Sequence, residues 1–199
     1  MKFYFATFLA VFTLNSLVIS QENNKDISEY KNQITFSPFV FAFSEFQLSY
    51  ERLVSENFGV RLSGNYHYGG NTFRSVEGFK QEIQFKYFFS TYQDRHSVIR
   101  MHFSPYFYLR QLNITLEDPI WDYDLGVTRD LFETQAISGG ILFGADFTFK
   151  SKFSMSLFFG GGIKRTNDDG APDTYSKNFF EPAYSGVYPK AGFDFGFVF

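Results

Sequence analysis

The 199-residue sequence has no cysteine, and this absence excludes two ways of stabilising or anchoring an exported protein. No disulfide framework can form, and no N-terminal cysteine can carry a lipid anchor. After residue 20, no stretch reaches the roughly 18 uninterrupted apolar residues that a membrane-spanning helix needs. The formal net charge is only -3, which is too small to indicate nucleic-acid binding or electrostatic steering. Nucleic acid is therefore not expected as a partner, and nothing indicates a cofactor.

Aromatic residues are what the sequence has in excess. It contains 30 Phe, 13 Tyr and 1 Trp, and aromatics make up 22% of the chain although another 20% is charged. Many aromatic side chains beside many charges are typical of strands that are apolar on one side only.

The last ten residues, 190–199, show this pattern most clearly. Phe193, Phe195, Phe197 and Phe199 share one face of a strand, because side chains alternate with period 2. The opposite face is small or charged. The aromatic face continues to the last residue, and no following segment covers it. A bilayer outside the sheet and a polar interior would accept this arrangement, whereas the alternative is an edge strand of a soluble sandwich.

Residues 1–20 are predicted to be a secretory signal peptide. Lys2 supplies a positive start, an apolar stretch follows, and Ser20 is small enough for a cleavage site before Gln21. A retained transmembrane helix is the alternative, but residues 21–31 are polar and show no stop-transfer pattern. We expect residues 21–31 to be a flexible N-terminal extension and residues 32–199 to form one domain.

Two neighbouring stretches, residues 46–54 and 57–68, predict a hairpin. Both alternate between apolar and polar residues, and a tight turn at residues 55–57 separates them. Pairing across this turn places Glu51 opposite Arg61 on the polar face. A slip of one residue would place every side chain on the wrong face. The same register pairs Ser49 with Ser63 and Gln47 with Asn65.

The alternation extends along the whole chain and predicts eight strands: residues 33–43, 46–54, 57–68, 79–89, 98–112, 134–149, 153–164 and 190–199. Pro38 counts against the first as a paired central strand, because proline has no backbone donor. Shorter connections at residues 55–57, 90–97 and 150–152 alternate with longer ones at 69–78, 113–133 and 165–187. Only the first hairpin, at Ser44, breaks this rule. Short periplasmic turns and long outer loops are typical of outer-membrane barrels.

The chain from residue 32 to Phe199 resembles the eight-stranded outer-membrane barrels of Gram-negative bacteria, such as the transmembrane domain of OmpA. The run from Leu48 to Arg52, followed by a turn and an amphipathic strand, is similar to small barrel families of unassigned function. The resemblance implies an all-β, eight-stranded antiparallel up-and-down transmembrane β-barrel in the cell outer membrane. It also implies that Phe195, Phe197 and Phe199 form a C-terminal assembly signal for the barrel assembly machinery.

Charged residues on the face opposite the aromatics are expected to form a lumen charge network. The interior of an eight-stranded barrel is just filled by side chains, and buried charges there must be paired. We therefore predict a lumen sealed by salt bridges, with Glu51 contacting Arg61; the alternative is that the same residues line a narrow ion path. The predicted members are Glu51, Arg61, Glu82, Lys86, Arg100, His102, Arg110, Asp146 and Asp194.

Two motifs bear on other chemistry. Barrel lipid A deacylases carry a His-x-Ser pair that faces the membrane, and His102 and Ser104 have this spacing. Here Met101 and Phe103 take the apolar face, so His102 and Ser104 are expected to point into the lumen. The run from Asn167 to Gly170 with Asp173 offers oxygen ligands to a hard cation, but acidic loops are commonly just solvated, and we predict no metal site.

The sequence thus favours a monomeric outer-membrane barrel, surrounded by outer-membrane lipid, with a structural, adhesive or interaction role and a closed lumen. A narrow passive pore is the alternative, and a lipid-modifying enzyme is the third hypothesis. We expect no enzymatic activity. No loop motif names an extracellular partner.

Overall fold

Eight antiparallel strands close into one barrel in the computed structural model, which describes residues 30–71, 74–118, 128–169 and 184–199. Each strand pairs with the next along the chain, and β1 pairs with β8 to close the ring. The predicted up-and-down β-barrel is therefore confirmed. The strands are β1 Asn32–Phe36, β2 Glu45–Ser55, β3 Phe58–Asn71, β4 Arg74–Gln93, β5 Ser97–Asp118, β6 Thr128–Phe149, β7 Phe153–Asp169 and β8 Gly186–Val198.

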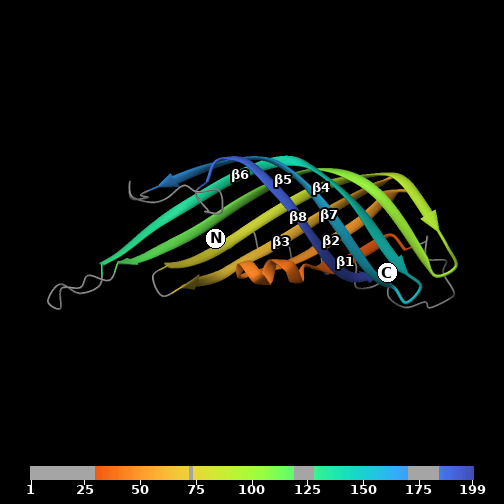
Figure 1. Cartoon of the computed structure of the whole chain (residues 1–199), viewed down its shortest axis with the longest axis horizontal. Helices are drawn as coiled ribbons and strands as arrows, with labels where there is room; N and C mark the ends of the chain where they lie inside the picture. The colour runs from red at the N-terminus through yellow and green to blue at the C-terminus, as the bar shows by residue number, and fades with distance from the viewer. Residues whose placement is uncertain (1–29, 72–73, 119–127, 170–183) are drawn as a thin grey trace.

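The strands differ in length, so one end of the barrel extends farther than the other. Figure 1 shows the strands crossing as a tilted, curved wall, with β5 and β6 extending farthest from the C-terminus. We call the end where β1 begins and β8 ends the terminal mouth, and the opposite end the outer mouth. No helix among the described residues is long and apolar enough to cross a membrane.

The two faces of the wall have the reverse of the burial found in a soluble barrel. Leu62 on β3 is 38% exposed, whereas its neighbours Arg61 and Ser63 are 1% and 4% exposed. The same alternation on β5 exposes Phe103 and Phe107 and buries the polar residues between them. Apolar side chains therefore cover the outside of the barrel, and most of the buried side chains in its lumen are polar or charged.

The register of the second hairpin is the one that the sequence predicts. Glu51 lies opposite Arg61, Ser49 opposite Ser63 and Gln47 opposite Asn65. Polar residues therefore meet polar residues along the inward face of β2 and β3.

The first strand is shorter than predicted. The stretch at residues 33–43 is not one strand, because β1 ends at Phe36 and a 3₁₀ helix, η3 (Pro38–Phe43), follows. Pro38 stands in the first turn of η3, where its fixed φ and missing N–H are tolerated, whereas a strand ladder would lose a hydrogen bond there. Because β1 ends early, the connection between β1 and β2 spans residues 37–44 and is not a short turn at Ser44.

η3 continues the wall where β1 stops. β8 pairs with β1 only from Phe195 to Val198, and beyond this the Ser37 hydroxyl donates to the Phe193 carbonyl over 3.2 Å. The ring of Phe39 packs on Phe193, with centroids 6.0 Å apart. Aromatic side chains of η3 therefore pack against β8, in a region where β1 no longer pairs with it.

Several strands extend into the predicted loops. β3 and β4 leave only residues 72–73 between them instead of 69–78. β5 and β6 leave 119–127 instead of 113–133, and β7 and β8 leave 170–185 instead of 165–187. On the opposite side of the barrel, β4 continues to Gln93 and shortens the predicted turn at residues 90–97.

The strand extensions toward the outer mouth have the polarity of a soluble sheet. Beyond Leu109 and Ile137, the inward side chains Val76, Leu112, Ile114 and Phe132 form a buried apolar cluster. The outward positions there carry polar side chains such as Gln111, Asn113 and Gln135. A search for strands with an apolar outer face loses the pattern at this point, which is why these residues were predicted as loops.

Glu133 shows that the outward face of this extension behaves as a polar surface. The side-chain amides of Gln135 and Gln111 donate to its carboxylate over 3.0 Å and 2.6 Å. These donors hold the pKa of Glu133 below its ordinary value, because they favour the charged form.

Candidate functional site: the lumen charge network

A buried ion pair between β3 and β8 lies near the centre of the lumen. The Arg61 guanidinium contacts the Asp194 carboxylate, and both side chains are almost fully buried. The same guanidinium donates to the hydroxyls of Thr35 and Ser49, over 3.2 Å and 3.0 Å. The Arg61 side chain therefore connects β1, β2, β3 and β8 across the seam that closes the barrel.

A second cluster lies closer to the terminal mouth and joins β2, β4 and β6. The Lys86 ammonium lies 2.7 Å from a Glu51 oxygen and 2.8 Å from an Asp146 oxygen. The Ser156 hydroxyl donates to the other Asp146 oxygen, Oδ1, and His102 Nε2 lies 3.4 Å from that same atom. One buried cation is thus shared by two carboxylates, and each carboxylate lies on a different strand.

The predicted contact between Glu51 and Arg61 is wrong, although the two residues lie opposite each other in the register. Arg61 pairs with Asp194, and Glu51 pairs with Lys86. The register fixes Cα positions, but long side chains reach across a narrow lumen to strands that are not hydrogen-bonded to their own. The closest counter-charge therefore comes from another part of the ring.

Two further layers of charge lie toward the outer mouth. Lys190 pairs with Glu82, and its ammonium lies 4.6 Å from the centroid of the Tyr106 ring. Above them, Glu45 contacts His67 at 2.8 Å and Lys80 at 3.3 Å. The basic side chains in these layers are 13–16% exposed, against 1–2% for Lys86 and Arg61. The charged side chains are therefore most deeply buried in the Arg61 and Lys86 clusters.

Sequence reasoning missed Glu45 and Lys80 as members of this network. Glu45 falls between the predicted strands 33–43 and 46–54, because the alternation does not mark the boundary between β1 and η3. Lys80 precedes Glu82 by two residues and therefore lies on the same face of β4, so the inward pattern of this strand would have predicted it.

The two remaining predicted arginines lie toward the two ends of the lumen. Arg110 lies on β5 toward the outer mouth and is partly buried. Arg100 lies on the same strand toward the terminal mouth, with its guanidinium 6.0 Å from the centre of the Phe88 ring. Within the described residues, Arg100 has no salt bridge and no side-chain hydrogen bond.

His102 and Ser104 point into the lumen, as their parity indicated. His102 Nδ1 lies 2.8 Å from the Ser104 hydroxyl, and Asp146 lies on the other side of the ring. This combination resembles a nucleophile, a base and an orienting carboxylate. However, Ser104 is 0% exposed and is packed among other lumen side chains, whereas a nucleophile must reach the substrate carbonyl. The contacts are those of a buried polar network.

Gly144 makes room for this network. A β-carbon at this position would lie 2.8 Å from His102 Nε2 and 2.6 Å from the Leu157 carbonyl oxygen. A larger residue would therefore displace the imidazole from Asp146.

The C-terminal aromatics lie on the outside of the barrel. Phe195 packs between Phe36 and Phe153, with ring centroids 6.3 Å and 5.8 Å away, and Phe197 is 61% exposed. Phe199 exchanges two backbone hydrogen bonds with Asn32, over 2.9 Å and 3.1 Å. Their role as an assembly signal stays a prediction.

The acidic run from Asn167 to Gly170 with Asp173, for which no metal site is predicted, lies mostly outside the described residues, which end at Asp169 on this side and resume at Tyr184. In the part of the chain that the structure describes, no group of three or more His, Asp or Glu side chains could hold a metal ion.

A family model described as "Protein of unknown function (DUF3575)" matches residues 11–193. The chain belongs to the DUF3575 family. This membership, together with the closed ring of eight strands, agrees with the resemblance to small barrel families of unassigned function. No curated protein matches the chain.

Among solved structures, the chain is similar to the N-terminal β-barrel domain of OprF from Pseudomonas aeruginosa. The match has 14% identity and a TM-score of 0.37, and it covers 85% of this chain and 98% of the OprF domain. The fold assignment for this DUF3575 member rests on its own strand pairing.

Proposed function

We propose that this DUF3575 member is an outer-membrane β-barrel with a closed lumen and a structural, adhesive or interaction role. The observation that supports this proposal is the reversed burial: apolar side chains cover the outside and charged side chains fill the inside. Each exposed apolar Å² costs roughly 25 cal/mol in water, whereas in lipid it costs nothing. A bilayer is the environment in which this surface is stable.

The outward apolar side chains form a band around the barrel, and the height of this apolar band fits a bilayer. The side chains that point outward on β3 are apolar or glycine from Phe58 to Tyr66. This length agrees with the roughly 9–11 residues that a tilted transmembrane strand needs. The apolar cluster of Val76, Leu112, Ile114 and Phe132 lies beyond the band, where β5 and β6 form a protrusion with a polar surface. We propose this protrusion as the part that meets an extracellular partner.

The location can be tested by cell fractionation. We expect the protein in the outer-membrane fraction, and we expect its migration in detergent gels to change after heating, because a closed barrel resists unfolding by detergent alone. Recovery of the folded protein from the soluble periplasmic fraction would rule out the membrane barrel.

The closed lumen can be tested in planar bilayers. We expect little conductance from the wild type, because Lys86, Glu51 and Asp146 form a buried ion cluster across the lumen. Lys86→Ala removes the shared cation and should raise ion conductance. Lys150→Ala, in the exposed turn between β6 and β7, is the control and should change nothing.

Steady conductance of the wild type would contradict the closed lumen. If, in addition, Glu51→Gln shifted the ion selectivity, the narrow passive pore would replace the present proposal.

A further inference from the structure

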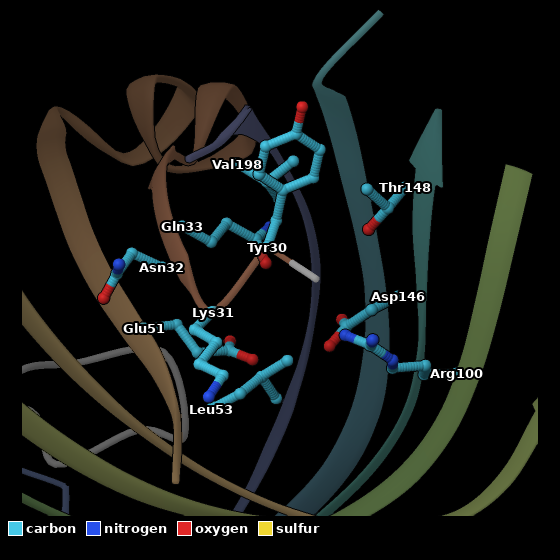
Figure 2. Close-up of a pocket in the computed structure, with 10 residues that line it drawn as sticks. All are labelled: Tyr30, Lys31, Asn32, Gln33, Glu51, Leu53, Arg100, Asp146, Thr148 and Val198. Carbon is cyan, nitrogen blue, oxygen red and sulfur yellow. The ribbon is translucent and has the colours of Figure 1, made fainter. Parts of the chain in front are cut away.

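A cavity opens at the terminal mouth, below the Glu51–Lys86–Asp146 cluster. The cavity is partly open to solvent. Figure 2 shows Lys31 and Glu51 on one side of the cavity and Arg100 with Asp146 on the other. The lining residues come from the segment before β1 and from β1, β2, β5, β6 and β8.

Arg100 lines this cavity and has a buried donor without a partner among the described residues. Its Nε is buried without a partner, and the described residues provide no salt bridge or hydrogen bond to its guanidinium. A guanidinium carries five N–H donors in a fixed fork. Leaving the buried Nε–H without a partner costs free energy, which a ligand with an acceptor oxygen would recover.

The neighbouring carboxylates already have their partners. Lys86 lies within 2.8 Å of both Glu51 and Asp146, and Asp146 also accepts from the Ser156 hydroxyl. An incoming anion would therefore bind Arg100 without breaking an existing contact.

The charge around the cavity also favours an anion. The charged side chains that line the cavity, Lys31, Arg100, Glu51 and Asp146, balance one another, and Lys86 beside the two carboxylates leaves one positive charge in excess. The excess corresponds to one negative charge on a ligand. A planar carboxylate matches the guanidinium fork with two parallel hydrogen bonds.

We propose that the cavity at the terminal mouth is a carboxylate-binding site, in which Arg100 holds the carboxylate and Lys31 contacts it from the rim. Phe88, beneath the guanidinium, keeps the fork in place. The inference depends on the geometry of the barrel and stands whether or not the lumen is closed to ions.

Two sources could supply the carboxylate. One is a small organic acid that enters from solution. The other is the chain itself, which carries Glu22, Asp26 and Glu29 shortly before Tyr30, a lining residue. The test must therefore distinguish a free ligand from a carboxylate of the same chain.

The experiment is a titration of the purified full chain in detergent with sodium acetate at constant ionic strength. The signal is the ¹⁵N–¹H resonance of the arginine Nε groups, and Arg100 is identified by its loss in Arg100→Gln. We expect acetate to shift this resonance and to saturate it. Arg100→Lys keeps the charge but loses the fork, and it should bind acetate about tenfold more weakly; this binding is followed on the backbone amides of Gln33 and Thr148.

Arg52→Gln is the control, because Arg52 is an exposed arginine on the same end of β2 and does not line the cavity. It should leave the acetate response unchanged.

A variant that combines Glu22→Gln, Asp26→Asn and Glu29→Gln separates the two sources. A response of the wild type to acetate supports a free ligand. A response of this variant alone shows that the chain's own carboxylate occupies Arg100. If acetate shifts the Arg100 resonance in neither protein, the carboxylate site is ruled out.

Discussion

Asp194→Ala is expected to destabilise the barrel by about 3–5 kcal/mol, because it leaves the Arg61 guanidinium buried without a counter-charge. Arg61→Ala should cost a similar amount, since it leaves the Asp194 carboxylate in the same position. Unfolding by urea from lipid vesicles, monitored by the shift in gel migration, measures both free energies.

The double variant should cost less than the sum of the two single changes, because the second substitution removes the charge that the first one left unpaired. The matched comparison is the cycle for Glu51 and Arg61, which lie opposite each other but do not touch. We expect clearly stronger coupling for Arg61 with Asp194 than for Arg61 with Glu51. Additive effects for Arg61 and Asp194 would show that their contact does not contribute to stability.

Leu62→Arg is expected to cost roughly 2–4 kcal/mol, because it places a charge in the middle of the apolar band on the outside of β3. The same unfolding measurement in lipid vesicles applies. The cost should fall when the arginine is placed nearer to either end of the band.

Asn113→Arg is the control for this prediction. Asn113 also points outward, but it lies beyond the band and faces Glu133 on β6. A surface substitution of this kind should stay within about 0.5 kcal/mol of the wild type. If the two arginines had equal effects, the outside of the barrel would not be a lipid-facing surface.

The parts of the fold that follow from period 2 could be predicted from the sequence. Alternation assigns Leu62 outward and Ser63 inward without further information, and the polar partners of Glu51, Ser49 and Gln47 determine the register of the second hairpin. A register error would have exposed charged residues to lipid along a whole strand, so the signal is strong.

The side-chain partners in the lumen could not be predicted in the same way. A strand pattern specifies which residues enter the lumen, but Arg61 bypasses the facing Glu51 and reaches Asp194 on β8. Which partner is closest depends on how the ring closes, and this is a property of all eight strands together.

Two other differences have local causes. Pro38 ended β1 early, and the aromatic residues after it were mistaken for the rest of a strand although they form η3. At the outer mouth, the inward side chains of β5 and β6 become apolar around Leu112 and Phe132, and the outward ones become polar. The alternation along each strand therefore continues, but the apolar positions now face the lumen. To predict these strand ends, the polarity of each face would have to be followed separately beyond the end of the apolar band.

The most direct test of the membrane barrel is the accessibility of single labels on its outer face. The chain has no cysteine, so Leu62→Cys and Asn113→Cys each create one labelling site. With a nitroxide at each site in lipid vesicles, the label at Leu62 should collide readily with oxygen and hardly at all with a water-soluble nickel complex. The label at Asn113 should show the reverse. A label at Leu62 that the nickel complex reaches as easily as one at Asn113 would contradict a bilayer around this barrel.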